Sequence, residues 1–299
     1  MAVSFVCPKP LRPGDAVAVV APSGAADLAR FEAGVEFLQR RYAVRWTQEL
    51  CTPAGYLAGS DERRLQALQE AIDSNDVKAI FAARGGYGAM RLLPKLRLKE
   101  RSPKWLVGFS DITALHALWQ RAGWQSLHGP VVTQMGTLPA EDLQSMVTAL
   151  EKDNSSSSLV GTRCLVPGTA VGPLLGGNLS VFCHLAGTPF MPDTRGAILL
   201  LEDIGEAPYR IDRMWTHLRL AGALRNLAGV VFGEFLQCED KDGKGCMETL
   251  ESLAAEIGVP CVAGFPFGHG ARNASVRLGG RARLSAGSLR LTCLHGDNK

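Results

Sequence analysis

Short apolar segments alternate with longer amphipathic segments along the first half of the chain. In two of the longer segments apolar residues recur every three or four positions, which predicts helices over 26–41 and 61–73 that each bury one face. A helical stretch is also expected from 88 to about 93, and another from 111 to 119. Strands are predicted for the apolar segments 15–21, 42–46, 77–83, 105–109 and 127–132. This alternation is typical of an α/β fold in which helices cover a parallel sheet.

A serine-rich segment divides the chain. The stretch 151–158 ends in four consecutive serines, which cannot contribute to a core. We therefore expect a first domain over residues 1–153, a linker over 154–165 and a second domain over 166–299.

The second half of the sequence begins with glycine-rich and proline-rich segments that we interpret as turns, at 166–168 and 172–180. The strongly apolar run 197–201 predicts a buried strand, and it ends in two carboxylates. A helix is expected to follow 172–180 and to end at about 186, and further helices are expected over 211–221 and 247–257. We also expect a strand over 227–232, a charged loop over 239–245 and strand-like alternation over 276–294.

Composition excludes several classes of function. The chain has 299 residues, 46% of them apolar, and a net charge of only +3. No basic stretch is interleaved with aromatic residues, so we expect no nucleic-acid partner, and no apolar run is long enough to span a membrane. Three prolines interrupt the first 15 residues, where a secretory signal would need an unbroken apolar stretch. The expected partner is a small molecule.

Eight cysteines are scattered without a C-x-x-C pair. In a chain of this size they are interpreted as reduced thiols rather than a disulfide framework, which favours a cytoplasmic location. The cysteines and histidines also lack the spacing of a zinc site, so we expect no metal site.

Ser110 lies where the predicted strand 105–109 meets a helical stretch. Gly108 precedes it by two residues, and a sharp strand-to-helix turn of this kind exposes a hydroxyl beside free backbone N–H groups. The Gly-x-Ser spacing is similar to a nucleophile elbow, although Ile112 stands where a second glycine is usual. The alternative is that Ser110 only caps the helix.

A nucleophilic serine needs a base within reach and a third group that orients the base. Among six histidines, His269 is flanked by glycine on both sides, so the backbone can bring its imidazole into a cleft. Glu202 ends the strand 197–201, and Asp203 is an adjacent rival that would point to the opposite face. His128 is a weaker candidate for the base. The other histidines lie in predicted helices or near the end of the chain, at His116, His184, His217 and His295.

The glycine-rich turn 84–88 follows a predicted strand and precedes a helical stretch. Such a turn can hold a phosphate, but its spacing matches neither the dinucleotide fingerprint nor the P-loop. We favour a role in stabilising an oxyanion through backbone N–H groups such as that of Gly86, which is worth on the order of 3 kcal/mol per donor.

Taken together, these motifs resemble the LD-carboxypeptidase family, the serine peptidases that include muramoyltetrapeptide carboxypeptidase and the microcin C self-immunity proteins. The resemblance is carried, in family order, by the segments 19–24, 84–88, 108–113, 176–180, 201–203, 209–213 and 268–270. It implies that Ser110 is the nucleophile, His269 the general base and Glu202 the residue that orients the base. It further implies an amino-terminal flavodoxin-like α/β sandwich and a carboxy-terminal swivelling β/α domain, with the triad assembled across their interface.

The resemblance also implies an oxyanion hole built from the backbone N–H groups of Asp111 and Gly86, with Gly85 as the donor if the register of that turn differs. An arginine is expected to hold the free carboxylate of the substrate because its planar fork suits that group. Arg84, Arg210 and Arg213 are the candidates.

The implied activity is hydrolysis of the bond between a diamino acid and the terminal D-alanine of a peptidoglycan tetrapeptide. This is a cytoplasmic step of cell-wall recycling, carried out by a homodimer without a cofactor. An immunity-type enzyme that cleaves a peptide from an acyl-sulfamoyl or phosphoramidate nucleotide is the alternative within the family, and it would need an aromatic platform for the base around 180–215. A non-catalytic protein that closes two domains on a small ligand is the alternative outside it.

Overall fold

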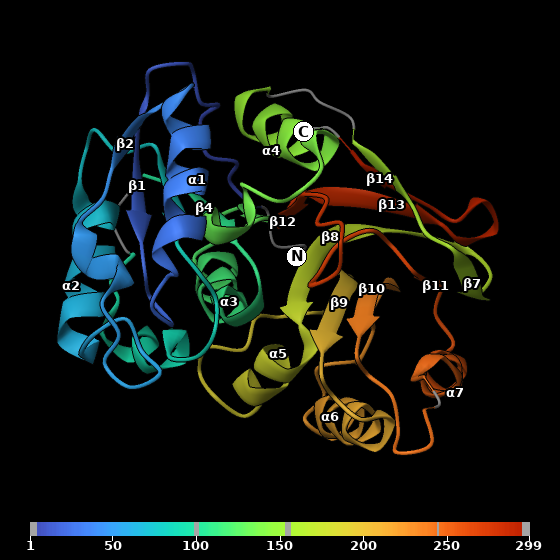
Figure 1. Ribbon diagram of the computed structural model, residues 1–299. Coiled ribbons are helices and arrows are strands. Elements are labelled where there is room, and N and C mark those ends of the chain that lie inside the picture. The colour runs from blue at the N-terminus through green and yellow to red at the C-terminus, as the bar shows by residue number, and fades with distance from the viewer. Residues whose placement is uncertain (1–4, 99–101, 153–156, 244, 295–299) are drawn as a thin grey trace.

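The computed structural model describes residues 5–98, 102–152, 157–243 and 245–294. Two α/β halves lie side by side: the amino-terminal half is blue to green and the carboxy-terminal half yellow to red (Figure 1). Each half is built around its own sheet. This arrangement agrees with the expected fold class.

The first sheet has six strands in the order β12-β5-β4-β3-β1-β2. Its five parallel strands are β1 (Ala16–Val20), β2 (Ala43–Arg45), β3 (Ala79–Ala82), β4 (Trp105–Gly108) and β5 (Ser126–His128). The sixth strand, β12 (Val276–Leu278), comes from the other half of the chain and pairs antiparallel with β5. The carboxy-terminal half therefore contributes an edge strand to the amino-terminal sheet.

Helices flank the first sheet. They are α1 (Leu28–Gln39), α2 (Asp61–Asp73), α3 (Thr113–Arg121) and α4 (Ala140–Glu151). Helix α1 begins two residues later than expected because the side chain of Asp27 accepts a hydrogen bond from the Arg30 N–H and caps the helix. Short 3₁₀ helices fill several connections: η1 (Gln48–Cys51), η2 (Ala89–Arg91), η3 (Leu93–Lys95), η4 (Ser110–Ile112) and η5 (Val132–Gln134).

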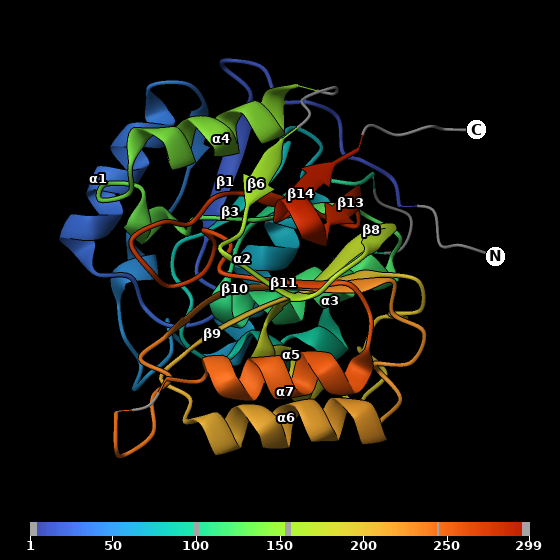
Figure 2. The same ribbon diagram turned by 90° about the vertical axis from the view of Figure 1, so that its right-hand side faces the viewer.

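The second sheet has eight strands in the order β6-β14-β13-β8-β9-β10-β11-β7. Its parallel centre consists of β8 (Thr169–Asn178), β9 (Ile198–Ile204), β10 (Gly229–Leu236) and β11 (Cys261–Ala263). Antiparallel strands extend it on both sides: β6 (Ser158–Val160), β7 (Arg163–Val166), β13 (Arg281–Ser285) and β14 (Arg290–Cys293), with η6 (Ala286–Ser288) between the last two. Helices α5 (Leu179–Leu185), α6 (Pro208–Leu220) and α7 (Met247–Ile257) lie together on one side of this sheet (Figure 2).

One expectation about local structure is wrong. The segment 172–180 is not a series of turns, because most of it belongs to β8, the longest strand. Its glycines allow close packing instead: a Cβ at Gly176 would lie 2.1 Å from the Leu200 carbonyl oxygen, and one at Gly177 would lie 2.4 Å from Thr113 Oγ1. The segment 154–165, expected to be a linker, contains β6 and the start of β7 in its described part.

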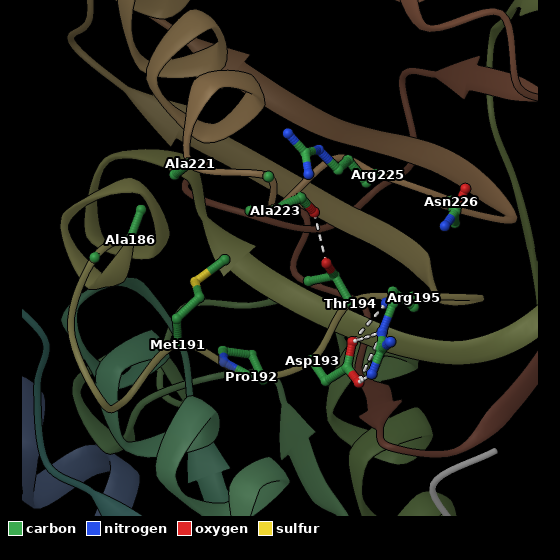
Figure 3. Close-up of a pocket in the computed structure, with 12 residues that line it drawn as sticks. Ala186, Met191, Pro192, Asp193, Thr194, Arg195, Ala221, Ala223, Arg225 and Asn226 are labelled. Carbon is green, nitrogen blue, oxygen red and sulfur yellow. Dashed lines mark hydrogen bonds and ion pairs between the residues drawn. The ribbon is translucent and has the colours of Figure 1, made fainter. Parts of the chain in front are cut away.

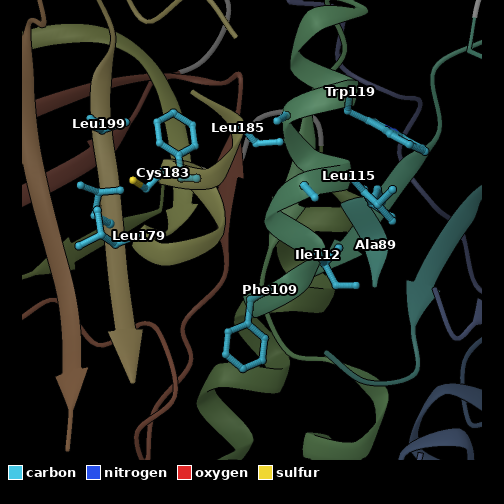
Figure 4. Close-up of a cluster of buried hydrophobic side chains, with 14 of the residues drawn as sticks. Ala89, Phe109, Ile112, Leu115, Trp119, Leu179, Cys183, Leu185 and Leu199 are labelled. Carbon is cyan, nitrogen blue, oxygen red and sulfur yellow. The ribbon is translucent and has the colours of Figure 1, made fainter. Parts of the chain in front are cut away.

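A buried apolar cluster joins the two halves (Figure 4). Leu115 and Trp119 enter it from α3, Leu179 and Leu185 from α5, and Leu199 from β9. Packing of this kind removes apolar surface of both halves from water. The helix that follows Ser110 is thereby fixed against the sheet that carries Glu202.

Candidate active site

Ser110 is held in a strained turn at the end of β4. Its φ of 63° is in the left-handed region, which costs a non-glycine residue on the order of 1–3 kcal/mol. The departure from the usual elbow spacing has a packing reason: a Cβ at Gly108 would lie 3.0 Å from Ile112 Cγ1, so the isoleucine side chain fills the space beneath the turn.

The hypothesis that Ser110 is a helix N-cap is wrong. The N-cap of η4 is Phe109 and that of α3 is Ile112, and neither helix receives a side-chain cap. The Ser110 hydroxyl instead lies 3.1 Å from Nε2 of His269, a residue 159 positions further along the chain. In this strained conformation the Ser110 hydroxyl points to His269, which belongs to the other half of the molecule.

His269 connects Ser110 to a buried carboxylate. Its Nδ1 lies 2.7 Å from Oε2 of Glu202, whose side chain is fully buried near the end of β9. Asp203 points the other way, as strand alternation predicts, and accepts hydrogen bonds from Asn178 Nδ2 and the Ser180 N–H, each at 2.9 Å. Glu202 is thus the carboxylate that contacts the imidazole.

Electrostatics favour a histidine that takes up a proton readily. Burial lowers the pKa of His269, but the hydrogen bond to Glu202 and the charges of Glu202 and Asp203 outweigh it and raise the pKa above its usual value. The imidazole is therefore a stronger base than an isolated histidine. Its Nδ1 faces the Glu202 carboxylate, and its Nε2 faces the Ser110 hydroxyl.

The glycine-rich turn after β3 closes over Ser110. A Cβ at Gly85 would lie 3.0 Å from Ser110 Cβ and 3.1 Å from its Oγ, so any larger residue here would press on the serine side chain. The Gly85 carbonyl oxygen accepts the Gly24 N–H at 3.1 Å. Among the described residues, the N–H groups of Gly86 and Asp111 have no acceptor. Both N–H groups that are expected to form the oxyanion hole are therefore without a partner in the described structure.

The side chain of Asp111 supports both turns and was missed at the sequence level. Its Oδ2 accepts the Ser23 hydroxyl at 2.6 Å and the Ala89 N–H at 2.8 Å, which ties the ends of β1, β3 and β4 together. Burial raises the pKa of Asp111, although these hydrogen bonds oppose the rise. The only signal in the sequence was a carboxylate directly after the serine, which also suits a helix start.

Arg64 is a second supporting residue. Its side chain is buried, donates to the carbonyl oxygens of Pro22 and, at 3.1 Å, Gly88, and pairs with Asp61. It therefore connects the turn after β1 to the glycine-rich turn. Its position four residues before Leu68, on the buried face of α2, was the available signal, since a charge on such a face needs partners.

Among the histidines that the structure describes, only His269 lies within hydrogen-bond distance of the Ser110 hydroxyl. His128 is buried between the rings of Phe109 and Phe267, and neither of its ring nitrogens has a partner in the described part of the chain. His116 is also buried, and its Nε2 lies 2.8 Å from the carbonyl oxygen of Gly108. His184 contacts the Ser180 carbonyl oxygen, and His295 lies outside the described residues.

A cavity of about 580 Å³ opens beside the glycine-rich turn and is lined by Gly24, Tyr56, Arg84, Gly86 and Tyr87. Both tyrosines are exposed, with ring centroids 5.5 Å apart. Arg84 donates only to a backbone carbonyl, at 2.9 Å, and has no carboxylate partner among the described residues. The cavity therefore combines a cation, aromatic walls and the expected oxyanion donor Gly86.

A second cavity, of about 500 Å³, lies at the amino-terminal end of β9, the end opposite Glu202 (Figure 3). Ligands of parallel sheets bind at the carboxyl ends of the strands instead. Two of its three charged residues, Asp193 and Arg195, pair with each other, and the Thr194 hydroxyl donates to the Ala223 carbonyl oxygen. This cavity offers no nucleophile with a base.

Three further features bear on the class of protein. No two of the eight cysteines, all of which lie in the described ranges, are joined by a disulfide. Within the described ranges no group of three or more His, Cys, Asp or Glu side chains is arranged to hold a metal ion. None of the helices formed by these residues is long and apolar enough to cross a membrane.

Comparison with known proteins identifies the family to which both halves are similar. The model of the LD-carboxypeptidase N-terminal domain matches residues 17–129, and that of the LD-carboxypeptidase C-terminal domain matches 171–284. The murein tetrapeptide carboxypeptidase of Pseudomonas aeruginosa is 34% identical, over 92% of this chain and 94% of that protein.

Solved structures give the same result. The muramoyltetrapeptide carboxypeptidase from Oxalobacter formigenes has a TM-score of 0.84 and 31% identity, and the match covers 94% of this chain and 99% of that one. The microcin C7 self immunity protein MccF has a TM-score of 0.87 and covers 97% of this chain and 99% of its own, but at 22% identity this likeness shows the fold alone.

Proposed function

This chain belongs to the LD-carboxypeptidase family and is a serine-type carboxypeptidase, and on that premise we propose that it releases the terminal D-alanine of murein tetrapeptides through Ser110, His269 and Glu202. One observation carries the proposal: a serine of one half and a glutamate of the other contact opposite nitrogens of the same imidazole, at 3.1 and 2.7 Å. A catalytic triad requires this arrangement, in which the base contacts the nucleophile through one nitrogen and the orienting group through the other.

In the proposed mechanism Ser110 Oγ attacks the carbonyl carbon of the residue before D-alanine while His269 Nε2 takes the hydroxyl proton. The N–H groups of Gly86 and Asp111 stabilise the oxyanion. His269 then gives its proton to the nitrogen of D-alanine, which leaves, and water hydrolyses the resulting ester on Ser110 with His269 again as base. Glu202 holds the Nδ1 proton and stabilises the imidazolium.

Arg84 is the arginine best placed to hold the carboxylate of D-alanine. It lines the cavity beside Gly86 without a carboxylate partner among the described residues. The two other candidates are engaged with Tyr209: the guanidinium carbons of Arg210 and Arg213 lie 5.9 and 5.3 Å from its ring centroid. A bidentate contact from Arg84 would restrict the enzyme to peptides with a free carboxyl end.

The immunity-type alternative lacks the aromatic platform that it would need from Trp215. This side chain is only 1% exposed, and its ring packs 5.9 Å from that of Phe232, so it cannot stack on a nucleobase. We also propose, from the family resemblance, that the enzyme acts in the cytoplasm in cell-wall recycling and forms a homodimer; light scattering of the purified protein tests the assembly.

The test is mass spectrometry of a muramyl tetrapeptide, and separately of the pentapeptide, after incubation with the protein or with Ser110→Ala. We expect release of one D-alanine from the tetrapeptide only, and a loss of several orders of magnitude in rate in the variant. Equal release by the variant would contradict the assignment of Ser110. Failure to cleave any tetrapeptide, with cleavage of an aminoacyl-sulfamoyl nucleotide, would favour the immunity-type activity instead.

A further inference from the structure

Glu234 lies close to the loop of His269. The proposed mechanism gives its carboxylate no role. It lies in the irregular part of β10, between Phe232 and Phe235, where the pairing with β9 shifts register. Its backbone N–H donates to the Phe267 carbonyl oxygen at 3.0 Å. This hydrogen bond fixes Glu234 against the segment that leads to His269, and its side chain is partly buried.

The two glycines around His269 each face a carboxylate. A Cβ at Gly268 would lie 2.9 Å from Oε2 of Glu202, and a Cβ at Gly270 would lie 1.3 Å from Oε2 of Glu234. Consecutive Cα atoms are about 3.8 Å apart, so the Glu234 carboxylate lies one residue beyond the proposed base. Glu202 binds the imidazole, whereas Glu234 does not.

Within the described ranges the Glu234 carboxylate has neither a hydrogen bond nor an ion pair. The cation in its surroundings, Arg272, already bonds both oxygens of Asp142 at 2.8 Å and pairs with Glu141 at 2.7 Å. Burial raises the pKa of Glu234, and Glu202 and Asp142 raise it further while Arg272 lowers it. A partly buried carboxylate without a counterion gains free energy when a ligand supplies a cation.

We propose that Glu234 binds the ammonium group at the far end of the side chain that precedes the scissile bond. This inference rests on the proposed function, in which that residue is a diamino acid. The carbonyl attacked by Ser110 is bonded to the Cα of this residue, so its side chain must lie beside the triad. Lysine and meso-diaminopimelate both carry an amino group at the far end of the side chain, and the contact with Glu234 would serve either.

The proposal gives the active site two opposite charges. Arg84 belongs to the glycine-rich turn that contacts Ser110, and Glu234 lies against Gly270, next to His269. An anionic leaving residue and an ammonium group on the preceding side chain match this polarity. A neutral side chain at the cleavage position would leave Glu234 desolvated without a partner, so the enzyme would discriminate against it.

The test compares two tetrapeptides that differ only in the third residue, lysine or Nε-acetyllysine, with wild type and Glu234→Gln. Glu36→Gln on the exposed face of α1 removes the same charge at a distance and is the control. A charge-assisted contact predicts that wild type and control prefer the lysine peptide by about 10 to 100-fold in kcat/KM. Glu234→Gln should lower kcat/KM for the lysine peptide alone and thereby remove the preference.

Three results would overturn the proposal: no preference in wild type, a preference that survives in Glu234→Gln, or an equal loss for both peptides in a Glu234→Gln variant that unfolds at the same temperature as wild type. Thermal unfolding of each variant shows whether an equal loss comes from misfolding, and Glu234→Asp, which keeps the charge, should then restore part of the preference. Release of D-alanine from neither peptide by wild type would refute the proposed function itself, which is a different result from a preference that Glu234 does not control.

Discussion

The two segments that meet at the active site are built in different ways. The turn of Ser110 is held from within its own half by hydrogen bonds, since Asp111 accepts from Ser23 and from the Ala89 N–H. The loop of His269 has glycines on both sides that fit around carboxylates of two neighbouring strands. The first segment tolerates backbone strain because a buried network fixes it. The second also has hydrogen bonds, from the Gly268 N–H to Asn273 and between His269 and Glu202, but its glycines pack so closely on the carboxylates that its shape helps to place the base.

This difference indicates where each segment is vulnerable. Loss of a hydrogen bond should loosen the serine turn and lower stability together with activity. Added volume in the histidine loop should displace the base while most of the fold stays intact. The buried apolar cluster that joins the two halves fixes the two segments relative to each other, because α3, which follows Ser110, packs against α5 and β8.

The largest effect is expected for Glu202→Gln, which keeps the shape of the orienting residue and removes its charge. The amide would favour the wrong tautomer of His269 and lose the stabilisation of the imidazolium, so kcat should fall about 10⁴-fold. Steady-state D-alanine release measures this. A loss below tenfold would mean that the contact between Glu202 and the imidazole is only structural.

A smaller loss, on the order of 10²-fold in kcat/KM, is expected for Gly268→Ala. Gly268 has a φ of 126°, and the added Cβ would press on Glu202, so the base should shift away from Ser110. Gly187→Ala, at a left-handed glycine with open space around it, is the matched control for backbone strain. Similar kinetics for both variants would show that shape does not place the base.

A substitution in the network that holds the serine turn should change the free energy of unfolding more than the rate of catalysis. Asp111→Asn replaces a buried acceptor of two hydrogen bonds by a neutral amide whose NH₂ has no evident partner, which should lower the free energy of unfolding by about 1–3 kcal/mol. Ser23→Ala leaves the Ala89 contact in place and should cost less. Denaturant unfolding of both variants ranks them, and the reverse order would refute the role of Asp111.

The smallest effect at neutral pH is expected at His128, which lies between Phe109 of the serine side and Phe267 of the histidine side. Burial, and then the nearby histidines, lower its pKa from 6.5 to about 3, and burial lowers that of His116 to about 4. The unfolded chain therefore binds more protons, so stability should fall as the pH drops from about 6.5 towards 3.

His128→Leu should change the unfolding free energy by less than about 1 kcal/mol at pH 7, because neither ring nitrogen has a partner in the described structure. It should also make the melting temperature less sensitive to acid between pH 6.5 and 4. An unchanged acid sensitivity in this variant would contradict the assignment of a buried neutral imidazole.

Much of the site could be predicted from the sequence because its residues end regular elements. Glu202 follows an unmistakably apolar run, Ser110 follows another, and glycines mark the loop of His269. The structure places these three side chains together, and their catalytic roles remain the proposal that the experiments test.

The sequence did not predict the roles of residues that depend on contacts with distant parts of the chain. Nothing local shows that Arg64 joins two turns or that Glu234 lies against a glycine 36 positions later. The glycines of β8 were interpreted as turns because the sequence does not show the backbone of β9 or the side chain of Thr113 that approaches them. Likewise, β12 pairs with β5 of the other half through a contact with no local signal.

The central claim is that a serine of one half and a histidine of the other form one catalytic unit. The most direct test is a double-mutant cycle on D-alanine release from a tetrapeptide, with Ser110→Ala, His269→Ala and the two changes combined. Groups that act as a unit are non-additive, so each single variant should lose nearly as much activity as the double variant. Additive losses would contradict the claim, because they would show that Ser110 and His269 contribute independently.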